Sequence, residues 1–132
     1  MVETIWCTAC ECYVDARLTS GKEIYPHRPD LADIPMWRCD ACHNYVGTHW
    51  KSKEPLKPLG VIADRDIMNA RRHIHALLDP MWKTGRIRRG RAYKYISKHL
   101  GYSYHTGEIR TIEEARKVYK IVLNLKKEVY NV

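Results

Sequence analysis

The sequence CTACECYV at residues 7–14 and the sequence CDACHNYV at residues 39–46 are two copies of one eight-residue phrase. Each copy holds two cysteines separated by two residues, an alanine between them, and Tyr-Val three residues after the second cysteine. A tryptophan precedes both copies, Trp6 directly and Trp37 by two residues. Two such pairs in one short chain are typical of a tetrahedral zinc site, because each pair can form a tight turn, or knuckle, that presents two thiolates to one ion. The repeat therefore predicts a zinc-stabilised module at the start of the chain.

The repeat also indicates which side chains bind the metal. Cys12 aligns with Asn44 and His43 aligns with Glu11, so neither Cys12 nor His43 has a counterpart in the other copy. The predicted ligands are the cysteines of the two pairs, Cys7, Cys10, Cys39 and Cys42. Four protein ligands leave no open position for water, so the single Zn²⁺ ion should be structural and not catalytic.

Two other uses of these cysteines are weaker. An iron–sulfur cluster also takes four cysteines, but the paired knuckles favour zinc. Redox chemistry of the thioredoxin type is disfavoured, because no βαβ pattern surrounds either pair. We interpret the fifth cysteine, Cys12, as a structural thiol, with an auxiliary or reactive role as the alternative.

Length and composition limit the class of protein. A chain of 132 residues is one domain, or a small metal module joined to a small second one. No run of about 18 apolar residues could span a membrane, and the first residues lack the features of a secretory signal. Cys-x-x-Cys spacing without such a signal favours metal-bound thiols over disulfides. We therefore expect a cytoplasmic protein without a membrane partner.

The positive charge is unevenly distributed along the chain. The net charge is +8, but residues 1–50 hold four basic and seven acidic residues, a net charge of −3. Residues 51–132 hold nineteen basic and eight acidic residues, a net charge of +11. This asymmetry favours a polyanionic or acidic partner for the second half, and a merely soluble surface is the alternative.

The first module, residues 1–52, is predicted to be zinc-ribbon-like or treble-clef-like and rich in β-structure. A strand is expected at residues 13–18, a long loop at 21–33, and short segments at 34–38 and 44–50 that enter and leave the second knuckle. Residues 51–58 contain two prolines and alternating charges, which predicts a linker.

The second module, residues 53–132, is predicted to hold three helices docked on the first, which makes the fold class α+β. The first helix should cover residues 61–78 and stop at Asp79-Pro80. The second should cover 91–100, with Gly101 as its C-terminal stop. The third should begin with a capping box at Thr111 and Glu114 and continue to about residue 129.

A basic stretch at residues 83–98 is the candidate contact surface. It carries seven lysines and arginines and no acid. Clustered cations neutralise phosphates and release counterions, and Tyr93 or Tyr95 could stack on a base. The alternative is a solvated helix face with both tyrosines in the core. With two arginines of the preceding helix, the predicted partner-binding residues are Arg71, Arg72, Lys83, Arg86, Arg88, Arg89, Arg91, Lys94 and Lys98.

The seven histidines do not form a nuclease site in the sequence. His43-Asn44 lies inside a zinc knuckle and lacks the third member of an HNH-type centre. His73 and His75 are two residues apart on a predicted helix, so they face away from each other and cannot chelate one ion. No Gly-rich phosphate loop, nucleophile elbow or carboxylate constellation is present, and we do not expect an enzyme.

The order of these features resembles a phage family of zinc-finger-containing proteins. The resemblance is carried by the first knuckle and by WRCDAC at 37–42, VGTH at 46–49, PLG at 58–60, RRHIH at 71–75, DPMW at 79–82, YKYISKHLG at 93–101 and HTG at 105–107. This chain departs from the pattern at Glu11 and His43, where a glycine often follows the second cysteine. The resemblance implies a phage origin, a bacterial host cytoplasm and action on host machinery, as in zinc-containing anti-CRISPR inhibitors.

Two functions follow from these observations. In the first, the protein binds and inhibits a host nucleic-acid machine, such as a CRISPR–Cas effector, through its basic surface. Because the surface is basic, it would grip an acidic protein patch or the bound guide RNA and would not mimic DNA. In the second, it is a DNA- or RNA-binding accessory or regulatory protein.

Overall fold

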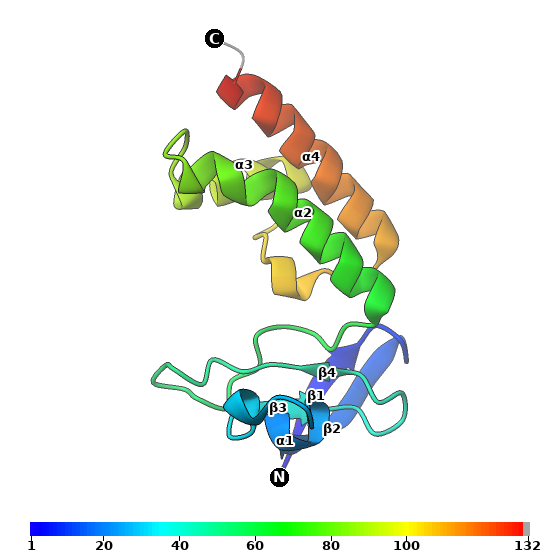
Figure 1. Cartoon of the computed structure of the whole chain (residues 1–132). Helices are drawn as coiled ribbons and strands as arrows, with labels where there is room; N and C mark the ends of the chain where they lie inside the picture. Colours follow the sequence, from blue (N-terminus) through cyan, green and yellow to red (C-terminus); the bar gives the residue numbers. More distant parts are fainter. Residues whose placement is uncertain (131–132) are drawn as a thin grey trace. The chain divides into compact units, whose positions relative to one another are not determined.

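The computed structural model describes residues 1–130 and divides the chain into two compact units, residues 1–64 and residues from Arg65 on (Figure 1). Unit 1 holds an antiparallel four-stranded sheet and the four paired cysteines, and unit 2 is helical. The fold is therefore α+β, as predicted. The predicted docking of the helices on the zinc module stays a prediction. None of the helices in residues 1–130 combines the length and apolar character that a membrane span needs.

The sheet of unit 1 has the order β1-β2-β3-β4, with every neighbouring pair antiparallel. The strands are β1 (Val2–Cys7), β2 (Cys12–Ser20), β3 (Pro35–Arg38) and β4 (Tyr45–Val46). Cys7 pairs with Cys12, so the first knuckle is the turn of the β1–β2 hairpin. The second knuckle connects β3 to β4 in the same way, because Arg38 pairs with Tyr45. The duplicated phrase therefore folds as two hairpin turns of one sheet.

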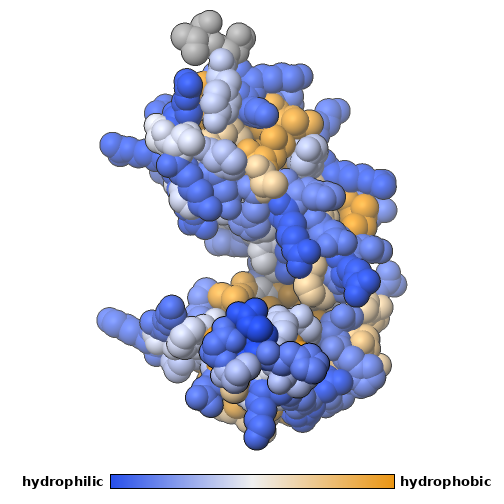
Figure 2. Space-filling view, in the orientation of Figure 1, coloured by the Kyte–Doolittle hydropathy of each residue, from blue (hydrophilic) through white to orange (hydrophobic). Residues whose placement is uncertain are grey.

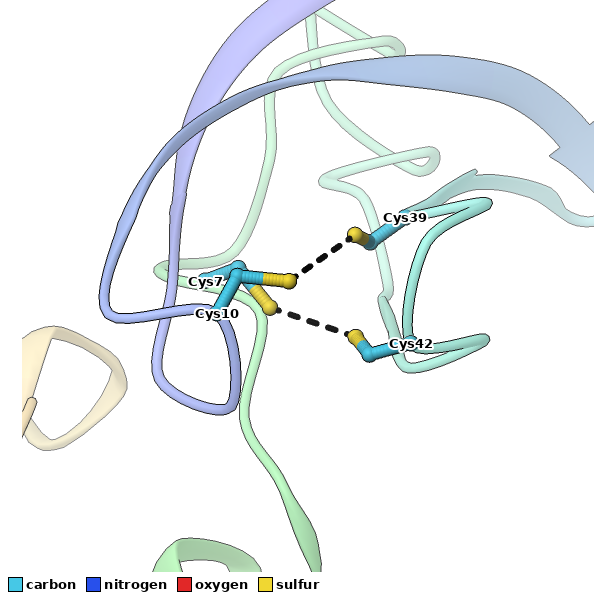
Figure 3. A group of neighbouring side chains, drawn as sticks. All are labelled: Cys7, Cys10, Cys39 and Cys42. Carbon is cyan, nitrogen blue, oxygen red and sulfur yellow. Dashed lines mark hydrogen bonds between the residues drawn. The ribbon is translucent and has the colours of Figure 1, made fainter.

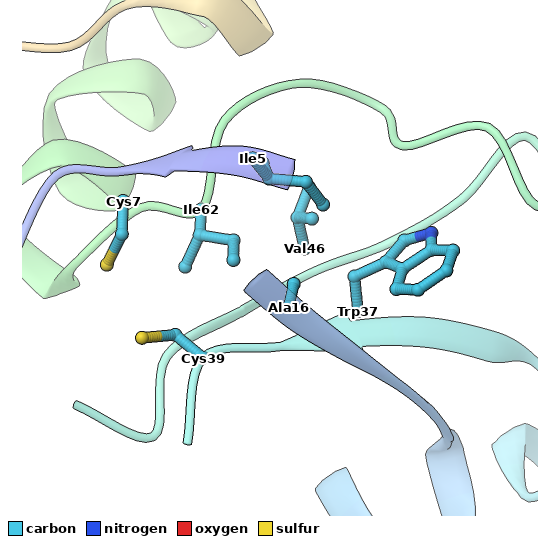
Figure 4. Close-up of a cluster of buried hydrophobic side chains, with 7 residues drawn as sticks. All are labelled: Ile5, Cys7, Ala16, Trp37, Cys39, Val46 and Ile62. Atoms are coloured by element: carbon cyan, nitrogen blue, oxygen red, sulfur yellow. The ribbon is translucent and has the colours of Figure 1, made fainter. Parts of the chain in front are cut away.

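The core of unit 1 is small and includes two of the cysteines (Figure 4). Its buried members are Ile5, Cys7, Ala16, Trp37, Cys39, Val46 and Ile62. Trp37 is 1% exposed, and its indole N–H donates a hydrogen bond of 2.7 Å to the carbonyl of Leu56. So small a core is consistent with a unit that depends on a metal for stability.

The segment expected to be a long loop after β2 holds two short helices. They are α1 (Gly21–Ile24) and the 3₁₀ helix η1 (Pro29–Leu31). The segment folds back on itself through a hydrogen bond from the Gly21 N–H to the Ile34 carbonyl at 2.9 Å. A Cβ atom on Gly21 would lie 1.8 Å from the carbonyl oxygen of Leu31, so only glycine allows this close approach.

The proline-rich stretch at 51–58 belongs to unit 1, where the sequence predicted a linker. The Lys57 carbonyl accepts a hydrogen bond from His49 N–H, and Gly47 accepts one from Leu59 N–H. Leu56 packs against the core. The chain leaves unit 1 only at Asp64, twelve residues beyond the predicted module boundary. These contacts depend on the folded structure of unit 1, so the local sequence pattern of prolines and charges could not predict them.

Unit 2 has the three predicted helices, at somewhat different bounds: α2 (Arg65–Lys83), α3 (Arg89–Leu100) and α4 (Ile112–Tyr130), with the 3₁₀ helix η2 (Thr106–Glu108) before α4. Helices α2 and α4 pack along each other, and α3 packs on α4 (Figure 1). The shared core is apolar and comes from all three helices: Ile67, Ile74, Leu78, Met81, Ala92, Ile96, Leu100, Ala115, Val118, Ile121, Val122 and Leu125.

The prediction that Asp79-Pro80 ends the first helix is wrong, because α2 continues through Pro80 to Lys83. Proline lacks the N–H that would bond to the preceding turn, which disfavours a helix interior. Here the continuation buries Met81, which is 1% exposed, and lets the Trp82 indole donate to the Asp79 carboxylate at 3.1 Å. Tertiary burial therefore outweighs the local signal.

The predicted C-terminal stop of α3 and the predicted N-terminal cap of α4 are confirmed, whereas α3 starts at Arg89, two residues before the predicted start. Gly101 has a φ of 92°, the left-handed conformation of a helix C-terminal stop. The Thr111 hydroxyl accepts a hydrogen bond from the Glu114 N–H at 3.1 Å. The Glu114 carboxylate accepts from the N–H of Arg110 at 2.8 Å, one residue before the position expected for a capping box.

Candidate metal centre and basic surface

The four predicted ligands converge in unit 1 (Figure 3). All four Sγ atoms lie within 4.8 Å of one another. The Cys7 and Cys42 sulfurs are 3.4 Å apart, and the Cys10 and Cys39 sulfurs are 3.7 Å apart. Zinc–sulfur bonds of 2.3 Å in a tetrahedron place neighbouring sulfurs about 3.8 Å apart. The donor set and its geometry fit one structural zinc ion with no position left for a catalytic water.

The two knuckles have the same backbone geometry. Glu11 N–H donates to the Cys7 carbonyl at 2.9 Å, and His43 N–H donates to the Cys39 carbonyl at 2.7 Å. Glu11 and His43 are left-handed, with φ of 54° and 69°. Glycine adopts this left-handed conformation readily, so each turn holds a residue with a side chain in a conformation that favours glycine.

The thiols do not ionise equally without a metal. Burial raises the pKa of the Cys7 thiol, and the hydrogen bond with Cys39 is the largest cause that raises the pKa of Cys10 to about 12. For Cys42, burial opposes ionisation, but hydrogen bonds from Asn44 lower the pKa; its side-chain amide lies 3.2 Å from the sulfur. Cys7 and Cys10 therefore resist ionisation, whereas Cys42 ionises more readily, and a divalent cation would compensate the charge of the thiolates.

A segment that the sequence reading missed closes the first knuckle. Ile62 N–H donates to the Trp6 carbonyl at 2.8 Å, and Thr8 N–H donates to the Ile62 carbonyl at 2.9 Å. The Thr8 hydroxyl accepts from Asp64 N–H at 2.8 Å. Residues 61–64 were expected to begin a helix. Instead they form a non-helical segment that pairs with the backbone of the first knuckle beside the metal ligands. The apolar run at 61–63 is the signal that could have indicated it.

A second missed feature is an ion-pair network beside the other knuckle. Arg17 on β2 donates to Asp40 at 2.8 Å and to Glu23 at 2.7 Å. Glu23 also accepts hydrogen bonds from Arg38 and, at 2.6 Å, from the Thr19 hydroxyl. These donors, with Arg17 the largest cause, hold the pKa of Glu23 well below its usual range. The network joins α1, β2, β3 and the residue that follows Cys39.

The remaining residues of the two repeats are not ligands. Cys12 is exposed on β2 and lies outside the group of four sulfurs. The His43 ring bonds to the Arg38 guanidinium through Nδ1 at 2.8 Å. Both observations agree with the ligand set predicted from the repeat.

The predicted partner-binding residues all lie in unit 2, but they do not form one group. Arg71 is half-buried, and its guanidinium donates to the carbonyls of Gly107 and Ile109 at 2.8 and 3.2 Å, so it positions the η2 segment. The other eight side chains are exposed: Arg72, Lys83, Arg86, Arg88, Arg89, Arg91, Lys94 and Lys98. None of these eight forms an ion pair with a carboxylate of residues 1–130.

Aromatic rings hold several of these cations. The Arg89 guanidinium lies 4.5 Å from the ring centre of Tyr93 and 5.6 Å from that of Trp82. Lys83 lies over Trp82 at 5.6 Å, and Arg86 lies over Tyr130 at 5.0 Å. Such contacts restrain a cation without neutralising it.

Two open depressions flank the exposed face of α3. The larger, about 850 Å³, is bounded by α3 from Arg89 to Lys98 and by residues 101–105; we call it the α3 hollow. The other, about 510 Å³, lies between α3 and α4. Lys94 and Lys98 line both, Arg89 only the first and Arg91 only the second. Arg72, Lys83, Arg86 and Arg88 line neither.

The two histidines of α2, His73 and His75, do not form a second metal site with other residues in the described range 1–130. His75 Nδ1 lies 3.2 Å from the Asp79 carboxylate. His73 is exposed and borders an apolar groove of about 340 Å³ between α2 and α4. Within residues 1–130, the four cysteines are the one group of three or more potential ligands that could hold a metal ion.

Comparison with known proteins gives one finding that covers the chain. No curated protein and no solved structure matches it. The model of the family described as a zinc-finger-containing domain, DUF3268, matches residues 3–128, which include all four ligands, the whole of α2 and α3, and α4 up to residue 128. The converging thiols and this match agree, and the chain belongs to the DUF3268 family of zinc-finger-containing domains.

Proposed function

We propose that this protein is a non-enzymatic, zinc-stabilised nucleic-acid-binding protein that contacts phosphates through the exposed face of α3. The observation that carries the proposal is a set of exposed cations on and before α3 that have no carboxylate partner within residues 1–130, several of them in contact with aromatic rings. Unpaired cations favour a polyanion, because binding releases the condensed counterions of the nucleic acid.

The contrast between the units supports an external partner for these cations. Unit 1 holds seven basic and nine acidic residues, and Arg17, Arg28 and Arg38 each pair with a carboxylate. From Arg65 on, the chain holds sixteen basic and six acidic residues, a net charge of +10. Hydrophilic side chains cover most of the face drawn in Figure 2. Unit 1 thus satisfies many of its cations internally, whereas α3 leaves its cations available.

Of the two functions predicted from the sequence, these observations favour direct nucleic-acid binding. Cations beside aromatic rings suit phosphates and bases together. An acidic protein surface would use the charges but would not need the rings. Inhibition of a host nucleic-acid machine is the more specific of the two predictions. It is compatible with this proposal, because a surface that binds phosphates would inhibit such a machine by binding its guide RNA or its target DNA.

The test is fluorescence anisotropy with duplex DNA, single-stranded DNA and RNA at about 50 and 200 mM salt. The wild-type protein should bind with micromolar or better affinity that falls steeply with salt. Replacing Arg91, Lys94 and Lys98 by alanine should weaken binding at least tenfold and reduce the salt slope by up to about three. All three side chains are exposed on α3, so the fold should remain.

The matched control removes the same charge from unit 1 by replacing Lys22, Lys51 and Lys53, which are also exposed, with alanine. This variant should bind almost as the wild type does. Equal losses in the two variants would contradict a localised site on α3. Absence of binding to every nucleic acid at low salt would overturn the proposal and favour an acidic protein partner.

A further inference from the structure

The α3 hollow combines three features that a flat basic surface lacks. It is concave, it carries cations without a carboxylate in its lining, and it has an exposed aromatic ring in its wall. Its cations are Arg89, Lys94 and Lys98, and its exposed ring is Tyr102, which is 50% accessible. The hollow is an open depression with a volume of about 850 Å³.

The Tyr102 ring is held in place although it is exposed. Its hydroxyl donates a hydrogen bond to the Glu114 carboxylate at the start of α4. Glu114 is itself fixed, because it also accepts from the backbone N–H of Arg110 at 2.8 Å. A tyrosine hydroxyl is neutral at physiological pH at its ordinary pKa of 10, and burial, followed by this hydrogen bond, raises the pKa of Tyr102 further, to about 12. Tyr102 is half exposed, and a neutral ring held in this way can receive a stacked base at little entropic cost.

The Arg89 side chain, which also lines the hollow, is likewise held in place by neighbouring groups. Its guanidinium lies over Tyr93, whose hydroxyl it also contacts at 3.3 Å. Tyr93 in turn packs against the buried Tyr104, with ring centres 5.5 Å apart. Tyr93 therefore supports Arg89 and is itself only partly exposed. The planar guanidinium is positioned for a phosphate, or for stacking on a base.

The shape of the hollow favours an unpaired strand over a duplex. In a duplex the bases are stacked and paired, so only phosphates could reach α3, and the Tyr102 ring would have no partner. In a single strand, phosphates can follow Lys94 and Lys98, one helical turn apart on α3, while one base enters the hollow.

We infer that the α3 hollow is a binding site for single-stranded nucleic acid, in which a base stacks on Tyr102 while Arg89, Lys94 and Lys98 contact the adjoining phosphates. This inference rests on the proposed function and adds the class of nucleic acid and the residue that distinguishes it. It assigns a separate role to each kind of side chain: the cations give the salt dependence, and the ring gives the preference for an unpaired base.

The experiment compares a short labelled oligothymidylate with a duplex of equal length. The wild type should bind the single strand more tightly. Tyr102→Ala should weaken single-strand binding about tenfold, without changing duplex binding or the salt slope. Tyr102→Phe keeps the stacking ring but loses the bond to Glu114 that fixes it, so this variant should lose less affinity for the single strand than Tyr102→Ala does.

Tyr119→Ala is the matched control, because Tyr119 is an exposed tyrosine of the same unit that lies outside the hollow. It should bind both probes as the wild type does, and thermal unfolding should show that both alanine variants remain folded. An unchanged affinity of Tyr102→Ala for the single strand would overturn this inference while leaving the proposed function standing, provided that the duplex binds.

Two competition experiments test whether the hollow binds a different class of ligand. Thymidine monophosphate should compete only weakly, and competition as strong as that of the strand would overturn the inference in favour of a mononucleotide site. Poly-glutamate should not compete at matched charge, and strong competition would overturn it in favour of an acidic peptide. Failure of both single strand and duplex to bind would instead defeat the proposed function itself.

Discussion

Glu11 and His43 show how single residues set the backbone strain in the turns that carry the metal ligands. Both follow the second cysteine of a knuckle and both have a positive φ, 54° and 69°. For a residue with a Cβ atom, this conformation costs about 1–2 kcal/mol. His43 recovers part of that cost through its bond to Arg38. Glu11 is exposed, and within residues 1–130 its side chain makes no hydrogen bond or ion pair of this kind. The two knuckles therefore carry unequal strain.

We expect Glu11→Gly to stabilise unit 1 by about 1 kcal/mol, because glycine adopts the left-handed conformation without steric cost. The gain should appear as a higher melting temperature of the zinc-loaded protein. Ala9→Gly is the control within the same knuckle, since Ala9 does not have a positive φ. It should lower the melting temperature, because glycine there only adds freedom to the unfolded chain. A loss of stability in both variants would refute the strain argument.

At the scale of elements, the ion network of Arg17, Glu23, Arg38 and Asp40 joins parts of unit 1 that are distant in sequence. It ties the short helix α1 to β2 and β3 and reaches the second knuckle at Asp40. Glu23 is central, because it accepts from two arginines and from Thr19. The segment between β2 and β3, which includes α1, is therefore held beside the metal ligands by these ion pairs.

The network should make stability depend on pH in a defined direction. The native pKa of Glu23 is lowered from its ordinary value of 4.5, so its stabilising effect is fully present above about pH 4.5. It is lost as the pH falls through the lowered native pKa. The difference in melting temperature between the wild type and Glu23→Gln should thus be greatest near neutral pH and shrink in acid. Both proteins lose zinc in acid, so this effect should cancel in the difference.

Asp30→Asn provides the comparison for this experiment. Asp30 pairs with Arg28, but both side chains are more than half exposed. Isolated exposed pairs contribute little to stability, so this variant should match the wild type across the same pH range. A pH-independent difference for Glu23→Gln would show that the carboxylate charge is not what stabilises the network.

At the scale of the whole molecule, each unit has its own means of stabilisation. Unit 1 buries a small apolar cluster that contains two metal ligands. Unit 2 buries a larger apolar set contributed by α2, α3 and α4. Only the first includes the metal, so the free energy of zinc binding should appear mainly in the folding of unit 1.

Removal of zinc should therefore unfold unit 1 selectively. Addition of a chelator, or the substitution Cys39→Ser, should abolish the β-sheet signal and release the ion, because structural zinc contributes folding energy directly. The helical circular-dichroism signal should persist, and nucleic-acid binding by α3 should persist with it. An unchanged melting temperature of Cys39→Ser would contradict the structural role of zinc. Simultaneous loss of the helices would contradict separate stabilisation of the units.

The sequence by itself determined the features that depend on local spacing. The four ligands could be predicted because the two knuckles repeat. The C-terminal end of α3 and the start of α4 could be predicted because Gly101 and Thr111 act on adjacent backbone groups.

Only the tertiary structure decided the features that join distant residues. The return of residues 61–64 to the first knuckle, the extension of α2 through Pro80 and the internal use of Arg71 each depend on a partner far along the chain. So does the α3 hollow, since Tyr102 becomes part of its wall only when the loop after α3 folds back beside that helix and α4 supplies Glu114. Local patterns specify turns and caps, whereas burial and pairing between distant segments decide where a helix ends and which cations remain free, because the free energy of those contacts exceeds local propensity.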